Sequence, residues 1–370
     1  MPSRYRSYLR FLGRRLAVTA MTLFGLMTLV FLMIKVIPGD EARIIAGPEA
    51  SPAQVEAVRV KLGLDAPLVV QYVRFAGRVA QGDLGTSIST LQPVVRDLAE
   101  VLPSTLELVV ATMVFSLLMA TAAALVAASR RGDMVDSSSR VVAVIAGGLP
   151  TFWLALVLQY LFAAKWRIFP ISGQQSFQFI ADPITGSPLL DALLRGNFSA
   201  FVNAVDYIVL PATALGVFFA AQLFRTLRAS LISILQSEFI VAVRSKGASF
   251  ARILLRHALP NAMGPTITLA GIQLGIMVGS AVLVEGIFGR QGLGAYLQNA
   301  VAQKDTFAVL GTVLVIGAFV CLINLVVDLL QLALDPRVRA AQFEGAARWR
   351  SRRSGAACSR AASSTCSSSR

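Results

Sequence analysis

The chain alternates long apolar runs with short polar segments, which is typical of a protein that crosses a membrane several times. A helix needs about 20 apolar residues to span the bilayer core. Six runs reach that length and predict membrane-spanning helices at residues 16–37, 103–129, 141–165, 207–227, 265–288 and 307–334. The first run is longer than the core of a signal peptide, and no small-residue cleavage site comes before Pro38-Gly39-Asp40, so we expect a permanent anchor.

Positive charges gather in alternate loops between these runs. No acidic residue accompanies the arginines ahead of the first run, and further basic clusters follow the second, fourth and sixth runs. They are Arg4, Arg6, Arg10, Arg14, Arg15, Arg130, Arg131, Arg140, Arg225, Arg228, Arg244, Lys246, Arg252, Arg256, Arg337 and Arg339. Because cytoplasmic loops of membrane proteins are enriched in Lys and Arg, we predict six spans with both termini in the cytoplasm.

Composition agrees with a membrane protein. Hydrophobic residues make up 55% of the 370 residues and charged residues 15%, whereas an ordinary soluble domain contains about 25% charged residues. The net charge of +14 is spread over short loops, unlike the basic, aromatic-lined surface of a nucleic-acid-binding domain. We therefore predict an all-α integral membrane protein that lies in the lipid bilayer and has no nucleic-acid partner.

The pattern divides the chain into three parts: a basic N-terminus at 1–15, a transmembrane domain at 16–339 and a tail at 340–370. Two external loops lie at 38–102 and 166–206, and a long cytoplasmic loop lies at 228–264. In the first loop, Ser51 and Gln54 can form a capping box around Pro52, and Gly63 is expected to end that helix. A second amphipathic helix follows at 68–79; we expect both at the outer interface or capping the spans. The second external loop is predicted to be irregular.

The tail at 340–370 is rich in Ser, Arg and Ala and offers nothing to bury, so we predict that it is disordered. It could be a basic arm on anionic lipid or a non-native end of the chain. Cys358 and Cys366 lie there and Cys321 lies in an apolar run. This spacing indicates neither a disulfide framework nor a zinc site.

No constellation for catalysis is present in the sequence. A phosphate-binding loop of the form Gly-x-x-x-x-Gly-Lys-Ser/Thr is absent, so ATP is not expected to bind to this chain in that way. The single histidine, His257, has no cysteine near it. The glycine-rich run from Gly286 to Gly294 is interpreted as a turn that leaves a membrane helix. We predict no enzyme activity, no cofactor and no metal site in this chain.

Polar residues within the spans are candidates for function, because charge in the bilayer centre is costly. Glu107 lies near the start of the second predicted span and Glu285 ends the fifth. Asn324 and Asp328 are four residues apart, so they share one face of the sixth span. That face could line a translocation path or form a structural contact between helices; the second interpretation is favoured because the other faces of this span are apolar.

The cytoplasmic loop contains two short predicted helices joined at a glycine. Residues 238–246 form an amphipathic stretch that Gly247 should end, since a left-handed turn is easiest for glycine. Ser249 can cap a second helix at 250–258, and Pro260 is expected to close it. Such a knob suits docking into another protein, or it lies on lipid headgroups through its basic residues. Periodicity alone does not decide between docking into a protein and contact with lipid headgroups.

The spacing of a few residues in this loop resembles the pattern of a known family. Gly247, His257 and Leu259-Pro260 resemble the "EAA" loop of ABC-importer permeases, in the Arg-His-Ala-Leu-Pro-Asn form of dipeptide/oligopeptide permeases. Further matching motifs occur in order over about nine-tenths of the chain: Ile37-Pro38-Gly39-Asp40, Leu62-Gly63-Leu64-Asp65, Gly82-Asp83-Leu84-Gly85-Thr86-Ser87, Pro150-Thr151-Phe152-Trp153, Pro170-Ile171-Ser172-Gly173, Leu210-Pro211 and Asp335-Pro336-Arg337. The first two point to the B-type permease subunit. The eponymous positions instead hold Val241-Ala242-Val243, and the tail has no counterpart.

This resemblance implies a type I importer permease in the inner membrane of a bacterium. It implies a second permease subunit, two cytoplasmic ATPases that bind ATP and Mg, and an external solute-binding protein, with di- or oligopeptides as substrate. The residues of the implied ATPase-coupling loop are Glu238, Ala242, Arg244, Lys246, Gly247, Ala248, Arg252, His257, Leu259 and Pro260. The alternative is an ion- or proton-coupled secondary transporter, which would more naturally show inverted repeats and buried relays.

Overall fold

A computed structural model describes residues 2–36, 42–43, 50–179 and 184–334, and the tail prediction for 340–370 lies outside these ranges. Within them the chain is helical, and its one strand-like pairing is an isolated bridge between Thr86 and Pro93. The helices are α1 (Pro2–Val36), α3 (Pro52–Leu62), α4 (Leu68–Ala80), α5 (Val94–Ser129), α6 (Met134–Gly148), α7 (Thr151–Leu158), η1 (Gln159–Lys165), η2 (Phe177–Phe179), α8 (Pro188–Leu194), α9 (Phe198–Leu235), α10 (Glu238–Ser245), α11 (Phe250–Arg252), η3 (Ile253–Ala258), α12 (Leu259–Ile287), α13 (Leu293–Ala302) and α14 (Thr306–Leu334).

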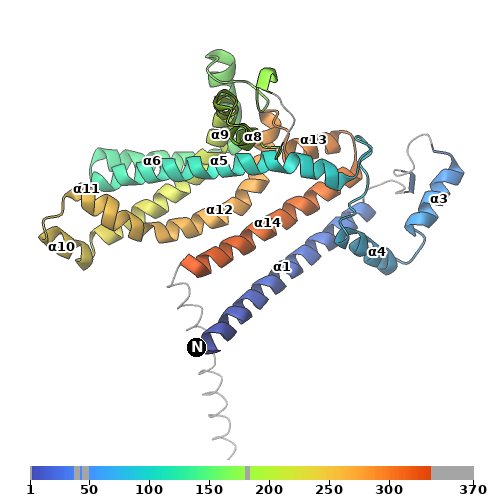
Figure 1. The fold of residues 1–370 in the computed structure, drawn as a ribbon, viewed down its shortest axis with the longest axis horizontal. Coiled ribbons are helices and arrows are strands. Elements are labelled where there is room, and N and C mark those ends of the chain that lie inside the picture. Colours follow the sequence, from blue (N-terminus) through green and yellow to red (C-terminus); the bar gives the residue numbers. More distant parts are fainter. Residues whose placement is uncertain (1, 37–41, 44–49, 180–183, 335–370) are drawn as a thin grey trace, which may run out of the picture.

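Five helical stretches of the described chain are long and apolar enough to cross a membrane: Leu12–Met33, Val94–Ser129, Phe198–Leu235, Phe250–Ile287 and Thr306–Leu329. A sixth is formed if α6 and the α7–η1 segment count as one broken span. The predicted all-α membrane fold with six apolar spans is therefore confirmed in class. Figure 1 shows α5, α6, α9 and α12 side by side, with α14 and α1 slanting along one edge.

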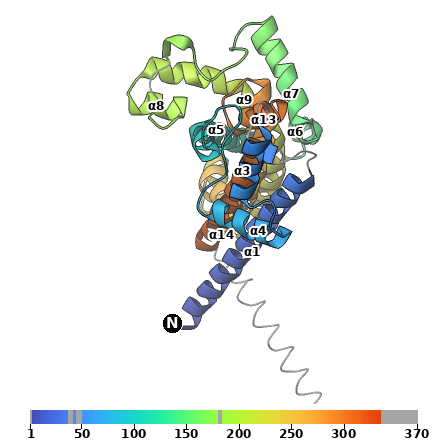
Figure 2. The same ribbon diagram turned by 90° about the vertical axis from the view of Figure 1, so that its right-hand side faces the viewer.

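The third predicted span, 141–165, is not one straight helix. Its two halves meet at an angle of 102°. Leu149 and Pro150 both have extended backbone at the junction, as expected because proline lacks an N–H and disfavours a helical residue before it. The second half projects away from the bundle, as does α8 on another side (Figure 2).

The prolines that were expected to begin or end spans lie inside helices instead. Pro103 and Pro265 are interior residues of α5 and α12, and Pro260 stands in the first turn of α12 rather than closing the helix before it. The π-helical turn η3 joins α11 to α12 directly ahead of Pro260. Such local widening lets backbone groups near a proline find other partners.

The segment predicted to be the second external loop also differs from the prediction, because part of it is helical. The Ser187 side chain accepts a hydrogen bond from Leu190 N, and Pro188 follows it in the first turn of α8. Asn197 caps α9 in the same way through Ala200 N. These caps extend ordered helix well before the predicted start at Tyr207, so sequence analysis missed two capping signals.

In the segment predicted to be the first external loop, the start and the end of α3 are as expected. Ser51 and Gln54 form a complete capping box at α3, and Gly63 ends that helix with φ of 66°. Helix α4 packs on α1 through Tyr72, whose hydroxyl lies 2.8 Å from that of Thr28 and whose ring meets Phe31 edge-on at 5.2 Å. The amphipathic helix α4 is thus attached to the first span, whereas the apolar residues of α3 do not gather on one face.

Small residues let the central helices approach closely. Ser116 on α5 donates a hydrogen bond to the Gly216 carbonyl on α9 at 3.0 Å. On α12, a Cβ added to Gly271 would lie 2.3 Å from the Val327 side chain of α14. Because apolar burial gives little drive between helices in lipid, such close packing and interhelical hydrogen bonds stabilise the bundle.

Candidate functional site

The loop predicted to be cytoplasmic folds into a knob, defined here as residues 237–260, at the end of α9. Ser237 precedes α10 with extended backbone, and Gly247 follows it with φ of 77°. Gly247 has no heavy atom within 4 Å of the position where a Cβ would stand. Glycine is therefore required there by backbone conformation rather than by crowding. Ser249 precedes α11, but its side chain makes no capping hydrogen bond, contrary to the prediction.

Buried aliphatic residues fasten the knob to the bundle. Leu254 and Ala258 on η3 belong to the hydrophobic core of the bundle, and Ile240 and Ile253 are each 1% exposed. The ring of His257 meets that of Phe239 edge-on at a centroid distance of 6.1 Å, which braces η3 against α10. His257 thus contacts a half-exposed aromatic side chain of the knob, and the described residues contain no group of three or more His, Cys, Asp and Glu side chains that could hold a metal ion.

Most residues of the predicted coupling loop are exposed on this knob. Exposed are Glu238, Ala242, Arg244, Lys246, Gly247, Arg252 and Pro260, and partly buried are Ala248, His257 and Leu259. The structure places eight of them on one short excursion of the chain between α9 and α12, and Leu259 and Pro260 at the start of α12. It also exposes four large apolar side chains there that sequence reasoning did not single out: Phe239, Val241, Phe250 and Leu255.

These apolar side chains give the knob a mixed apolar and basic surface. Phe239 and Leu255 are each more than half exposed, and they are interspersed with the basic residues of the loop. An exposed apolar patch with a polar rim is typical of protein interaction sites. The sequence carried a signal for this surface, because α10 has apolar residues, Phe239 and Val241, on both sides of its buried residue Ile240.

A buried ion pair stabilises the base of the knob. Arg228 on α9 donates two hydrogen bonds to the Asp136 carboxylate on α6, at 2.6 Å each. The Asp136 side chain is only 3% exposed. This bidentate pair, which sequence analysis did not identify, holds α6 against the part of α9 that leads into the knob.

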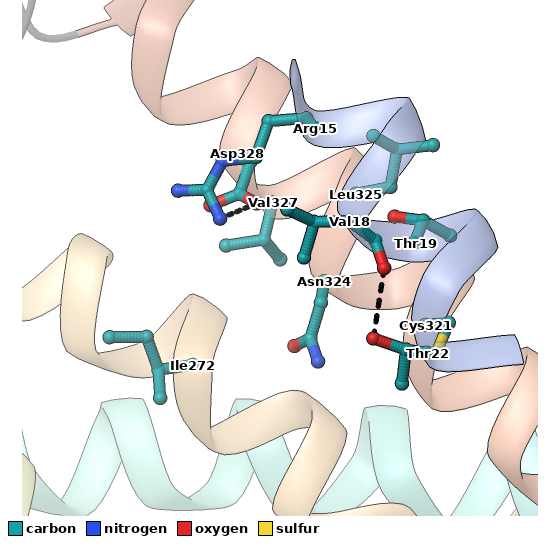
Figure 3. Close-up of a pocket in the computed structure, with 10 residues that line it drawn as sticks. All are labelled: Arg15, Val18, Thr19, Thr22, Ile272, Cys321, Asn324, Leu325, Val327 and Asp328. Carbon is teal, nitrogen blue, oxygen red and sulfur yellow. Dashed lines mark hydrogen bonds and ion pairs between the residues drawn. The ribbon is translucent and has the colours of Figure 1, made fainter. Parts of the chain in front are cut away.

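The Asn324/Asp328 face of α14 lies against neighbouring helices. Asp328 Oδ2 is 2.8 Å from Arg15 Nη1 on α1, and Asn324 approaches Gly275 on α12. Figure 3 shows both residues at a hollow of about 380 Å³ between α1, α12 and α14. Its lining consists of Arg15, Val18, Thr19, Thr22, Ile272, Cys321, Asn324, Leu325, Val327 and Asp328.

The third candidate polar residue, Glu285, lies elsewhere. It is fully buried near the end of α12, where Gly294 N donates to its Oε2 atom at 2.7 Å. Gly292 passes so close that a Cβ there would fall 2.3 Å from Glu285 Oε1. The glycine-rich run after α12 is therefore a turn folded around this carboxyl group, as the sequence indicated.

A second buried ion pair lies beside this turn. Arg290 is fully buried, and its Nη2 atom donates to Glu107 Oε1 on α5 at 3.1 Å. The other Glu107 oxygen accepts from the Ser187 hydroxyl and from Leu189 N. Burial lowers the pKa of Arg290, and the adjacent Glu107 carboxylate opposes that shift. The sequence analysis placed Glu107 near the start of the second span. Because α5 begins at Val94, Glu107 is instead an interior residue of its helix.

The turn at residues 87–89 wraps around the carboxylate of Asp305. Asp305 Oδ2 accepts from Ser87 Oγ at 2.6 Å and from Ile88 N at 2.7 Å. Its Oδ1 atom accepts from Ala308 N at the start of α14. Burial raises the pKa of Asp305, but its hydrogen bonds lower it by more, so the net pKa lies below the ordinary value.

Two family models match the chain. The binding-protein-dependent transport system inner membrane component matches residues 120–340, and the N-terminal model of such membrane components matches residues 8–109. The chain belongs to this family. The resemblance to ABC-importer permeases is thereby confirmed, and the family is one of multi-pass inner-membrane proteins rather than secondary transporters.

Named relatives of this permease family align over almost their whole length. The di/tripeptide transport system permease protein DppB of Pseudomonas aeruginosa is 36% identical over 332 residues, 90% of this chain and 99% of the relative. The dipeptide transport system permease protein DppB of Escherichia coli K12 is 35% identical over 335 residues, with the same coverage. The glutathione transport system permease protein GsiC of Escherichia coli O6:H1 is 34% identical over 331 residues, again covering 90% and 99%.

Proposed function

We propose that this chain is a permease subunit of an ATP-driven importer and forms, with a second permease, a path for di- or oligopeptides. The observation that carries the proposal is the exposed apolar and basic knob on a bundle whose relatives include dipeptide permeases. The peptide class rests on those relatives, since a glutathione permease aligns almost as well.

The proposed complex contains two cytoplasmic ATPases and an external solute-binding protein besides the second permease. ATP and Mg bind to the ATPases, which carry out hydrolysis, while this chain contributes no catalytic group. Both termini and the knob lie on the cytoplasmic face, and α3 and α4 lie on the external face. The Lys/Arg distribution along the sequence supports this orientation.

The knob couples ATPase motion to the spans through α12. Residues Phe250–Ile287 form one continuous helical stretch from the knob to the glycine-rich turn. Within that turn, Arg290 binds Glu107 on α5. A displacement of the knob by an ATPase therefore tilts a single rigid element whose far end is tied to another span, and access changes from one side of the membrane to the other.

Peptides are zwitterions with varied side chains, so the path needs water and backbone contacts more than a tight pocket. Selection among peptides falls chiefly to the binding protein. In this proposal Asn324, Asp328 and Glu285 stabilise the bundle, because each side chain already contacts a neighbouring helix or turn.

The test is transport by the complex reconstituted in vesicles with its partner permease, ATPases and binding protein. We expect uptake of a labelled dipeptide that requires internal ATP and loaded binding protein. Glutathione serves as the competing substrate. Uptake driven by an ion gradient without ATP would contradict the importer mechanism, and uptake of glutathione in preference to every peptide tested would contradict the substrate class.

A further inference from the structure

The buried carboxylate of Glu107 joins two segments that lie far apart in the sequence. One of its oxygens accepts from Arg290 Nη2 at 3.1 Å, in the turn after α12. The other accepts from the Ser187 hydroxyl and, at 3.1 Å, from Leu189 N, both at the start of α8. Helix α8 and this turn are therefore connected through one side chain of α5, at the opposite end of α12 from the knob.

Water is excluded from this network. Arg290 is fully buried, Ser187 is 2% exposed and Glu107 is 8% exposed. Hydrogen bonds to charged groups are stronger in such a site than in water, and a buried carboxylate that loses its cation is costly. When the turn after α12 moves, the Glu107 carboxylate is therefore expected to follow Arg290 rather than to separate from it.

The Arg290 side chain depends on this one partner. Among the described residues, its Nε and Nη1 atoms have no hydrogen-bond partner. Burial lowers the pKa of Arg290, and Glu107 opposes this shift more strongly than Glu285 does. A shift of the turn therefore acts first on the bond between Arg290 and Glu107.

The first turn of α8 depends on the same carboxylate. Helix α8 has only seven residues, and so short a helix is not stable by itself. Its cap, Ser187, gives its hydroxyl proton to Glu107, which leaves the lone pairs of Oγ to accept from Leu190 N. Along α8, Leu190, Leu193 and Leu194 are exposed. The position of the Glu107 carboxylate therefore decides whether the capping hydroxyl is correctly oriented.

We propose that Glu107 transmits movement of the end of α12 to α8, so that the knob and α8 respond to each other across the length of the bundle. The proposal rests on the proposed function, in which an ATPase displaces the knob and α12 with it. Each step is a contact of the described chain: α12 leads to the turn that carries Arg290, Arg290 binds Glu107, and Glu107 binds Ser187. Glu107 is a positioning residue, because it acts through its two neighbours.

This link works in both directions. A coupling free energy between two sites is reciprocal, so a partner that binds α8 more tightly in one state of α12 also shifts the knob toward that state. The bistable element is the start of α8, which is either capped and held by Glu107 or released from it.

Hydrogen–deuterium exchange of the α8 backbone amides measures the link in the assembled complex without nucleotide. Arg290→Lys replaces the planar guanidinium by a shorter ammonium group. It should speed exchange in α8 about tenfold, the effect of losing one hydrogen bond to a charged group. In a Ser187→Ala background, which lacks the hydroxyl that joins α8 to Glu107, Arg290→Lys should have little further effect. Arg228→Lys changes the other buried ion pair and is the matched control, with exchange in α8 unchanged.

Two outcomes would overturn the proposal, because each would show general destabilisation in place of a specific link. One is an equal effect of Arg290→Lys and Arg228→Lys on α8. The other is an undiminished effect of Arg290→Lys in the Ser187→Ala background.

A second comparison keeps the proposal testable if Arg290→Lys does not assemble. Exchange in α8 is measured with and without ATP trapped on the ATPases, in the wild type and in Ser187→Ala. We expect ATP to change exchange in the wild type and to change it less in Ser187→Ala. Unchanged α8 exchange in a wild-type complex that imports with ATP would overturn the transmission. The comparison of variants needs no nucleotide, so it judges the link even where ATP-driven uptake fails.

Discussion

Gly247 shows how one backbone angle can matter more than a side chain. Its φ of 77° lies in the left-handed region, and open space surrounds the position where a Cβ would stand. Substitution therefore strains the backbone without a clash inside this chain.

We predict that Gly247→Val costs about 1 kcal/mol or more in this turn, because a β-branched residue disfavours positive φ. The reoriented helices should uncouple ATP hydrolysis from loaded binding protein in reconstituted vesicles. Gly247→Asn is the matched control and should keep more coupling, since asparagine tolerates the left-handed region. Wild-type coupling in Gly247→Val would remove this loop from the mechanism and favour contact with lipid headgroups.

Asp305 allows a prediction about pH. Its pKa is depressed in the folded chain, so the group stabilises the fold at any pH above its unfolded pKa of about 3.9 and loses this effect as pH falls through the folded pKa. Asp305→Asn should lower the free energy of unfolding by about 1–3 kcal/mol at pH 7. Thermal unfolding in detergent should show a gap between variant and wild type that narrows below pH 4; a gap independent of pH would refute the assignment.

At the scale of elements, two buried ion pairs tie helices together: Asp136 with Arg228, and Glu107 with Arg290. The second joins α5 to the turn after α12, and Ser187 at the start of α8 adds a hydrogen bond to it. Three segments far apart in the sequence are thus held at one point, at the opposite end of α12 from the knob.

We predict that Arg290→Met strongly destabilises the chain, by about 3–5 kcal/mol, because it leaves the buried Glu107 carboxylate without its cation. The double variant Glu107→Gln/Arg290→Met should recover much of the loss, since it removes the unpaired charge. Folded yield after detergent extraction, measured by fluorescence size-exclusion chromatography, compares the two. If the double variant behaves no better than Arg290→Met alone, the cost does not come from unpaired charge.

At the scale of the whole molecule, topology is the most direct prediction. The Lys/Arg distribution predicts six spans, with α3 outside the membrane and the knob inside. Single cysteines at Ser51 and Ser249, both exposed residues, should therefore react with an impermeant maleimide from opposite sides. The predicted topology has three membrane crossings between Ser51 and Ser249. Labelling from the same side would contradict it, because an even number of crossings would then separate the two sites.

Local patterns in the sequence determined the helical class, the apolar spans, the capping box at Ser51 and the turn at Gly247, because each depends on neighbours along the chain. Family motifs in the loop at 228–264 indicated the permease family. Pro150 by itself predicts a break in the helix, but the angle of the bend depends on how the two halves pack against their neighbours. Only the tertiary structure decided that Asp328 pairs with Arg15, that Arg290 finds Glu107 183 residues away, and that Phe239 and Leu255 face outward. These are properties of helix packing, and many alternative pairings satisfy the same local pattern until the bundle selects one.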